Sequence, residues 1–275
     1  MSDLINIGSL QLNQKRLMTI TRGAHNTITV ADAALILKMP TRAVAKLMAR
    51  WAEAGSLSRI KRGVYLTKPT ISSDVDTAPV EPWVIAEDLY RPCYIGGLTA
   101  AVYWGLLDNT LQANMVLTTQ KPRSRRQSIS GIKFTLRSIS LETMFGLISV
   151  WKGQCKFQVS DPSRTMIDFL VDPGMGGGIH NVADMLIAYL KSEHKNIELL
   201  YDYAKLLQSG VVLKRLGFLL ERYEPCERGT IALCKMLMST GAVKLDPQLS
   251  ADSLITRWGL WVPHDIESYL LRKRK

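Results

Sequence analysis

The sequence predicts an α+β protein, in which a small N-terminal module of helices and a β-hairpin precedes a larger domain. Three observations lead to this prediction. Residues 10–67 show helical apolar periods and end in a glycine-centred hairpin pattern. Residues 68–82, KPTISSDVDTAPVEP, hold three prolines and no apolar period, as linkers do. Short segments that alternate apolar and polar residues up to residue 160 then give way to helical periods after residue 179.

The length of 275 residues suits two domains joined by a linker. We expect the N-terminal domain over residues 1–68, the linker over 69–82 and a second domain over 83–275. Within the second domain, we expect residues 83–173 to be mixed α/β and residues 179–275 to be mainly helical.

Composition excludes several classes of protein. With 47% apolar residues the chain can bury a core, which excludes disorder throughout. No apolar run reaches the roughly 18 residues of a membrane helix, and residues 1–10 lack the pattern of a secretory signal. We therefore expect a cytoplasmic protein without membrane partners. The four cysteines and four histidines are dispersed, so we expect no metal site and no cofactor.

The net charge of +11 favours polyanionic partners, and its distribution points to the N-terminal quarter. Residues 1–70 hold 11 basic side chains against three acidic ones, so they carry most of the excess.

Three helices are expected in the N-terminal domain. The first spans Leu10–Thr21. The second begins at Thr29, which with Asp32 forms a capping-box pattern, and runs to about Leu37. Pro40 breaks it, because the residue before a proline disfavours the helical conformation. We expect Thr41 to cap a third helix that ends at Gly55.

The third helix has the two faces of a recognition helix. At about 100° per residue, one arc is apolar and the opposite side carries a basic stripe of Arg42, Lys46 and Arg50. The small Ala45 and Ala49 flank this stripe and leave room for a major groove. The apolar arc consists of Val44, Leu47, Met48 and Trp51.

A strand pair with a basic tip follows the third helix. We expect strands over Leu57–Ile60 and Val64–Thr67, joined by Lys61-Arg62-Gly63. Such a hairpin serves as the wing of a winged helix-turn-helix and reaches backbone phosphates. We therefore expect Thr41, Arg42, Lys46 and Arg50 to face the major groove of double-stranded DNA, and Arg59, Lys61 and Arg62 to hold phosphates. The alternative is a solvated basic helix face.

The second domain is expected to begin with short helices and strands. Asp161-Pro162 starts a helix with Asp161 as N-cap and an apolar face of Met166, Ile167 and Leu170. The glycines of Asp172–Gly178 are expected to form a hinge, and mainly helical sequence follows from Ile179. The expected short elements are helices over Trp83–Tyr90 and Leu98–Trp104, and strands over Met115–Thr119, Ile132–Leu136 and Lys156–Ser160.

A second basic segment, KPRSRRQSISG, lies between two of these strands and contains Lys121, Arg123, Arg125 and Arg126. It is either an exposed hairpin loop or a second polyanion contact, to flanking DNA or to an acidic protein. No nucleophile or zinc-protease motif occurs, and no cluster of carboxylates suits a nuclease metal, so we do not expect an enzyme.

Ordered segments within residues 57–258 carry a resemblance to a known family. They are Lys61-Arg62-Gly63-Val64-Tyr65, Tyr94–Ala101 with Trp104-Gly105-Leu106, Asp161–Asp168 with Gly177-Gly178-Ile179, Arg215–Glu221, Leu245-Asp246-Pro247 and Arg257-Trp258. In this order they resemble the AbiEi-type antitoxins of abortive-infection type IV toxin–antitoxin systems. Gly97 and Thr99 depart from the family pattern, and Trp261–Lys275 has no counterpart in it.

The resemblance implies a role in phage defence. An N-terminal winged helix-turn-helix would repress its own operon at inverted repeats in the promoter. A larger C-terminal domain would counteract a nucleotidyltransferase toxin encoded by the next gene. The type IV class presumes that antitoxin and toxin form no direct inhibitory complex. For this family, neutralisation through a stable complex and neutralisation without one both stay open.

Three other functions are compatible with the residues. The first is a winged-helix transcriptional regulator whose C-terminal domain senses a ligand or partner, with no toxin. The second is a nuclease tethered to DNA. The third is a protein-interaction module whose basic face binds an acidic partner.

Overall fold

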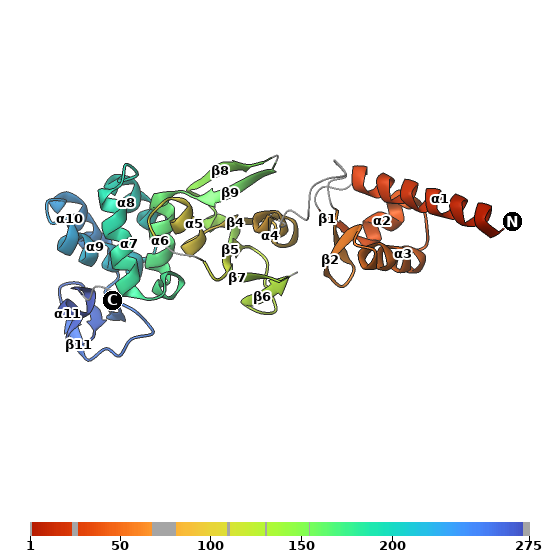
Figure 1. Ribbon diagram of the computed structural model, residues 1–275. Coiled ribbons are helices and arrows are strands. Elements are labelled where there is room, and N and C mark those ends of the chain that lie inside the picture. The colour runs from red at the N-terminus through yellow and green to blue at the C-terminus, as the bar shows by residue number, and fades with distance from the viewer. Residues whose placement is uncertain are drawn as a thin grey trace. The chain divides into compact units, whose positions relative to one another are not determined.

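The computed structural model describes residues 2–23, 27–67, 81–108, 111–129, 131–153 and 155–271 (Figure 1). The chain divides into two compact units, one of residues 1–91 with 126–134 and the other of residues 92–125 with 135–275. The fold is mixed α/β with an N-terminal helix-turn-helix, as the sequence predicts. Residues 69–80 of the expected linker, which spans residues 69–82, lie outside the described residues. The expected domain boundaries therefore stay a prediction.

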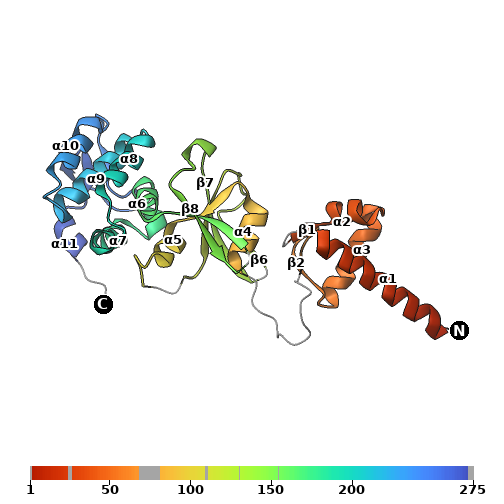
Figure 2. The ribbon, with the colours of Figure 1, turned by 90° about the horizontal axis from the view of Figure 1, so that it is seen from above.

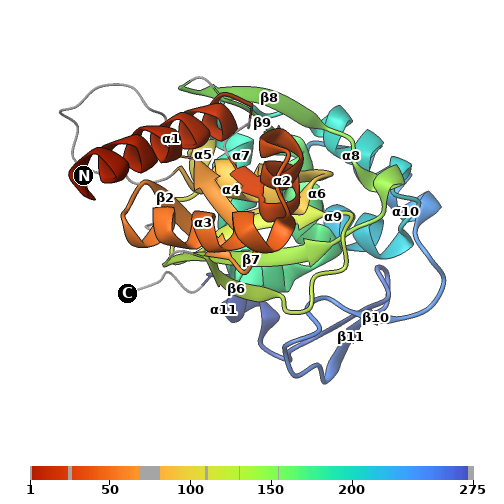
Figure 3. The same ribbon diagram turned by 90° about the vertical axis from the view of Figure 1, so that its right-hand side faces the viewer.

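The N-terminal module, residues 2–23 and 27–67, has the predicted order of helices and hairpin (Figure 3). Its helix α1 extends beyond the predicted range at both ends. One strand, β1, was not predicted, because three residues are too few to show an alternating pattern. The elements are α1 (Ser2–Gly23), β1 (Thr27–Thr29), α2 (Val30–Leu37), α3 (Thr41–Glu53), β2 (Leu57–Lys61) and β3 (Val64–Thr67).

The three strands form a small antiparallel sheet in the order β1-β3-β2. One face of this sheet and one face of each helix enclose a core of their own. The buried side chains include Ile20 of α1, Ile28 of β1, Val44 and Met48 of α3, and Tyr65 of β3. The module thus has the separate core that an autonomous winged helix-turn-helix requires.

The ends of α2 and α3 follow local chemistry. Thr29 and Asp32 form the predicted capping box: the Thr29 side chain accepts from the Asp32 amide at 3.1 Å. Lys38 ends α2 in the left-handed conformation, with φ of 52°. The predicted cap at Thr41 is wrong, because Pro40 occupies the N-cap position and Thr41 is the first helical residue. Gly55, with φ of 73°, follows the end of α3 and supplies the predicted left-handed stop.

A six-stranded mixed sheet with the strand order β6-β7-β5-β4-β9-β8 is the main β-structure of the remaining chain. All three predicted strands are present, as β5, β7 and β9, and both predicted helices are present, as α4 and α5. Strands β4, β6 and β8 were not predicted. The elements are α4 (Pro82–Tyr90), β4 (Cys93–Ile95), α5 (Gly97–Tyr103), β5 (Asn114–Thr118), β6 (Arg126–Ile129), β7 (Ile132–Ser138), η1 (Leu141–Thr143), β8 (Leu147–Lys152) and β9 (Cys155–Ser160).

The three unpredicted strands lack a clear alternation of apolar and polar residues. All three residues of β4 are buried, because β4 pairs with strands on both sides, antiparallel with β5 and parallel with β9. In β6 the first three residues are polar, and in β8 the exposed positions do not alternate. Burial on both faces, or on neither, removes the two-residue period on which the prediction depends.

Helices predominate in the part of the chain after β9, beginning with α6, whereas the sequence led us to expect mainly helical structure from residue 179. The helices α7, α8 and α9 of this part pack around α6 (Figures 1 and 2). Short strands that the sequence did not reveal form a second small sheet, with the order β10-β12-β11. The elements are α6 (Pro162–Val171), η2 (Pro173–Gly176), α7 (Ile179–Lys191), α8 (Ile197–Leu206), α9 (Gly210–Tyr223), α10 (Arg228–Leu237), β10 (Val243–Lys244), β11 (Ser253–Ile255), β12 (Leu260–Val262) and α11 (Ile266–Leu271).

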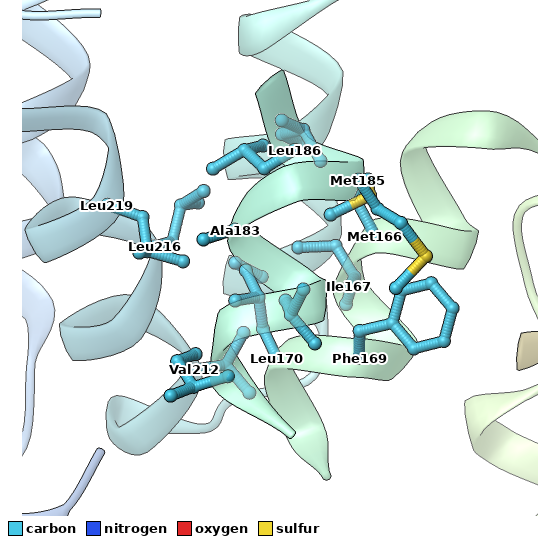
Figure 4. Close-up of a cluster of buried hydrophobic side chains, with 14 of the residues drawn as sticks. Met166, Ile167, Phe169, Leu170, Ala183, Met185, Leu186, Val212, Leu216 and Leu219 are labelled. Carbon is cyan, nitrogen blue, oxygen red and sulfur yellow. The ribbon is translucent and has the colours of Figure 1, made fainter. Parts of the chain in front are cut away.

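The core of this part lies between α6, α7 and α9 (Figure 4). The predicted apolar face of α6 is confirmed, since Met166, Ile167 and Leu170 are fully buried. Figure 4 shows them against Ala183 of α7 and Leu216 of α9. Asp161 caps α6 as predicted, because its side chain accepts from the Arg164 amide at 2.6 Å.

The glycine-rich segment Asp172–Gly178 is not the free hinge that we expected. Its first part is the 3-10 helix η2, whose N-terminus is capped by the Asp172 side chain at 3.1 Å from the Gly174 amide. Gly176 is buried, and a Cβ there would lie 2.7 Å from Val182. Gly176 therefore permits close packing between α6 and α7, while Gly177 and Gly178 adopt positive φ of 82° and 103° between η2 and α7.

Candidate nucleic-acid interface

Helix α3 is fixed to the N-terminal module by its apolar face and presents its basic stripe outward. Val44 and Met48 are completely buried, and Trp51 is 8% exposed. The basic stripe of Arg42, Lys46 and Arg50 is exposed on the opposite side. Since side chains three or four residues apart share a helix face, the three basic groups form one row along α3. The predicted two faces of α3 are confirmed.

The turn between α2 and α3 sets the angle at which α3 is presented. Lys38 adopts the left-handed conformation, and the amide of Met39 donates to the carbonyl of Ala34 at 3.1 Å. The carbonyl of Pro40 accepts the first hydrogen bonds of α3, from Ala43 and Val44. Exposed Thr41 lies at the first position of α3, beside Arg42. The N-terminal residues of α3 are therefore exposed, as base-reading residues of a helix-turn-helix are.

The wing consists of β2, β3 and the turn at Arg62-Gly63. Gly63 has φ of 79°, and no atom lies within 4 Å of a Cβ built on it, so the turn requires glycine for its backbone conformation. The carbonyl of Gly63 accepts from the amide of Val30 at 2.9 Å, which fixes the wing tip to the start of α2. A bulge between Arg59 and Lys61 twists β2.

The basic residues of the wing lie as the sequence predicts, as far as the structure describes them. The side chains of Arg59 and Arg62 are exposed. Lys61, which we expected in the turn, is the last residue of β2. Its side chain is not among those that the structure describes. Among the described side chains of residues 11–67, only Asp32 and Glu53 are acidic, and Asp32 serves the α2 cap. The outward face of α3 and the wing is therefore strongly basic, which suits phosphate.

Only part of the second basic segment, KPRSRRQSISG, is a loop. Lys121, Arg123 and Arg125 are exposed in the connection that follows β5. Arg126 is also exposed but belongs to β6, so the segment precedes the β6–β7 hairpin instead of forming its tip. This geometry is compatible with both readings of the segment, and its contact with a polyanion stays a prediction.

Within the described ranges, no group of three or more histidine, cysteine or carboxylate side chains could hold a metal ion. All four cysteines are free thiols. Among the same residues, no helix is long and apolar enough to cross a membrane.

The motifs of residues 94–258 that carry the family resemblance form buried polar contacts that the sequence did not reveal. One of them, the α6 network, joins Tyr94, Arg164 and Asp168. The Arg164 Nε lies 2.9 Å from Asp168 Oδ1, and the Tyr94 hydroxyl donates to Asp168 Oδ2 at 3.0 Å. All three side chains are at most 4% exposed. Burial raises the pKa of Asp168. At Arg164 burial alone would lower the pKa, but the charges and hydrogen bonds of Asp168 and Tyr94 together outweigh it and raise the pKa of the guanidinium.

Other motif residues connect elements distant in sequence. The Asp246 carboxylate accepts from the Ile179 amide at 2.8 Å and so caps α7 from 67 positions away. The Arg215 guanidinium donates to the carbonyls of Leu170 and Val171 at the end of α6, and to that of Lys244. These contacts stabilise the scaffold. Spacing along the chain carries no signal for them, because each pair meets only through tertiary packing.

Comparison with known proteins supports the reading of the N-terminal module. A family model described as "Transcriptional regulator, AbiEi antitoxin" matches residues 15–68, from within α1 to the end of the wing. The resemblance to AbiEi-type antitoxins is thereby confirmed, and a transcriptional regulator family implies DNA binding. The match includes α3 and the wing with all seven predicted DNA-binding residues. No protein of curated function matches the chain.

Proposed function

We propose that this protein represses its own operon through the N-terminal module and neutralises a toxin through the rest of the chain. The observation that carries the DNA-binding part is the basic stripe of α3, anchored by Val44 and Met48 and accompanied by a basic wing. The antitoxin part is supported by the family match and by the motif segments downstream of the module.

The proposed mechanism assigns a role to each basic residue. Thr41, Arg42, Lys46 and Arg50 face the major groove, where Arg42 forms a bidentate contact with a guanine. This assignment follows from the place of Arg42 in the first turn of α3, the part of a recognition helix that meets base edges. The wing holds backbone phosphates through Arg59, Lys61 and Arg62.

Two copies act together on the operator. A single winged module reads too few base pairs to select one site in a genome. Inverted repeats in the promoter of the operon would seat one copy on each half-site, with or without dimerisation in solution.

The base-reading role is tested by comparing cognate with random duplex DNA at several salt concentrations. Arg42→Ala is expected to cost about 1–3 kcal/mol on cognate DNA and little on random DNA. Arg62→Ala and Lys61→Ala are each expected to weaken both duplexes alike and to lower the salt slope by about one. Exposed Arg228, in the other compact unit, provides a matched control: Arg228→Ala should leave both affinities unchanged. Equal losses on both duplexes for Arg42→Ala would refute base reading.

The antitoxin role is tested by growth of bacteria that express the adjacent gene. The partner proposed here is a nucleotidyltransferase toxin. We expect growth to stop with an empty vector and to return with the full-length protein. The triple variant Arg42→Ala, Lys46→Ala, Arg50→Ala should also restore growth, since neutralisation is assigned to residues 83–275. Rescue by residues 1–80 alone would contradict this assignment.

The growth assay also distinguishes the antitoxin from the alternative function, a transcriptional regulator without a toxin. If the neighbouring gene is harmless, the protein is better described as a winged-helix regulator whose C-terminal domain senses a ligand or partner. A ligand-dependent rise in the melting temperature of the full-length protein would then support that function.

A further inference from the structure

Helices α8 and α10 border an open groove of about 620 Å³ that the proposed DNA contacts do not use. Tyr201 and Ile197 of α8 supply apolar surface, and Thr230 and Leu233 line the side of α10. Both helices belong to the same compact unit and contact each other (Figure 2). The groove therefore lies within one compact unit of the protein.

An apolar row continues the groove along α10. Leu233, Met236 and Leu237 are 40%, 70% and 42% exposed, and their positions fall within about 100° of the helix circumference. Leu233 belongs to both features, so groove and row form one surface. Fully buried Cys234 and the partly buried Ile231 hold the other side of α10 against the core. Three large apolar side chains gathered on one helix face, one of them a methionine, are typical of a surface that binds another helix.

Acidic side chains line the groove. Glu198 and Asp202 of α8 and Glu227 before α10 all line it. Within the described residues, none of these three carboxylates has an ion pair, whereas Lys195 at the rim is paired with Glu224 at 3.0 Å. A protein with a net charge of +11 thus keeps a local acidic rim beside exposed apolar side chains. This rim repels nucleic acid and attracts cationic groups.

We propose that the α8–α10 groove binds an amphipathic helix of a partner protein, with apolar side chains on one face and lysine or arginine along its border. The apolar face covers Leu233, Met236 and Leu237, and the cationic border meets Glu198, Asp202 and Glu227. This site lies outside the proposed DNA-binding residues, and the proposal holds whether or not the chain neutralises a toxin.

The probe for this proposal is a synthetic 18-residue helix of leucine and lysine with a single leucine face, titrated into the full-length protein. A leucine–glutamate helix of the same pattern is the matched probe. Because the whole protein is cationic, long-range attraction favours the glutamate peptide everywhere except at an acidic site. We expect saturable binding of one lysine peptide per chain and weaker binding of the glutamate peptide.

Two variants locate the binding site. Glu198→Gln combined with Asp202→Asn, and Leu233→Ser combined with Met236→Ser, should each weaken binding of the lysine peptide at least about tenfold. Controls of the same chemistry elsewhere are Asp252→Asn and Leu141→Ser, both at exposed positions, which should leave the affinity unchanged. All variants change exposed side chains, and circular dichroism checks that they fold.

Three results would overturn the proposal. The first is equal or tighter binding of the glutamate peptide. The second is unchanged affinity in both groove variants. The third is self-association of the protein through α10, seen as a dimer that Leu233→Ser with Met236→Ser dissociates, because the occupant would then be a second copy.

Discussion

The α6 network provides the sharpest test of how the C-terminal part is stabilised, through the variant Asp168→Asn. The substitution keeps the volume of the side chain but removes its charge. Arg164 would keep a neutral amide oxygen in place of the carboxylate, the Tyr94 hydroxyl at 3.2 Å from Nη2, and the face of the Phe145 ring 4.2 Å from its guanidinium carbon, but no opposite charge in the network. Its Nη1 already has no hydrogen-bond partner. A buried guanidinium that loses its carboxylate costs about 3–5 kcal/mol of unfolding free energy.

The reverse variant, Arg164→Met, should cost less than Asp168→Asn. Asp168 can take up a proton when its partner is removed, and burial already raises its pKa, whereas an arginine cannot lose its proton in a protein. With the folded-state pKa above the unfolded value, the folded state binds the proton more tightly. The free energy of unfolding of Arg164→Met should therefore be greatest at pH values below the pKa of Asp168 in the unfolded chain. It should fall as the pH rises through the pKa of Asp168 in the folded protein.

Urea unfolding of both variants at several pH values measures these effects. The exposed pair Lys195–Glu224 is the control, and Lys195→Gln should change the free energy of unfolding by at most about 1 kcal/mol. A loss below about 1 kcal/mol for Asp168→Asn would refute the reasoning, since breaking a buried pair costs more than that. So would Arg164→Met if its stability did not fall with rising pH.

Three further predictions concern other parts of the same compact unit. Gly217→Ala should lower the free energy of unfolding by about 1–3 kcal/mol, because the added Cβ would lie 2.2 Å from the Trp258 ring. The control Gly229→Ala, in α10 with no atom within 4 Å of the added Cβ, should be neutral or stabilising. Equal effects of the two substitutions in urea unfolding would contradict this contrast. Asp246→Ala should lower the melting temperature through loss of the α7 cap, worth about 1–2 kcal/mol, and an unchanged value would argue against that cap. Burial raises the pKa of the Cys234 thiol to about 12, so as the pH rises the thiol loses its proton in the unfolded chain before it does in the folded one. The free energy of unfolding should therefore fall between about pH 9 and pH 12, and it should fall less steeply in Cys234→Ala. The same pH dependence in both proteins would count against this role of Cys234.

The assignment of roles to the motif residues follows from where they lie. Arg164, Asp168, Arg215 and Asp246 are buried and hold elements together, so their substitution should reduce the proposed antitoxin activity through loss of folding. Glu198, Asp202 and Met236 are exposed and should leave stability nearly unchanged. A stability measurement combined with the peptide titration therefore distinguishes scaffold residues from contact residues.

The sequence by itself determined the elements whose chemistry is local. The two faces of α3 follow from residue spacing along a helix, and the caps at Thr29 and Asp161 follow from side chains that bond amides three residues on. The basic stripe and wing could be predicted for the same reason, because each basic residue lies within one helix or one hairpin. The error at Thr41 is also local, since Pro40 adopts a conformation that occupies the cap position.

Only the tertiary structure decided the features that join distant residues. Strand β4 pairs with β5 and β9, and burial on both sides erases its alternation. The α6 network connects Tyr94 with Asp168, and the α7 cap connects Asp246 with Ile179. The α8–α10 groove exists because α10 buries one face and leaves the other exposed beside α8. Sequence spacing specifies which residues share a face of one element, whereas packing alone decides which faces meet and which stay open.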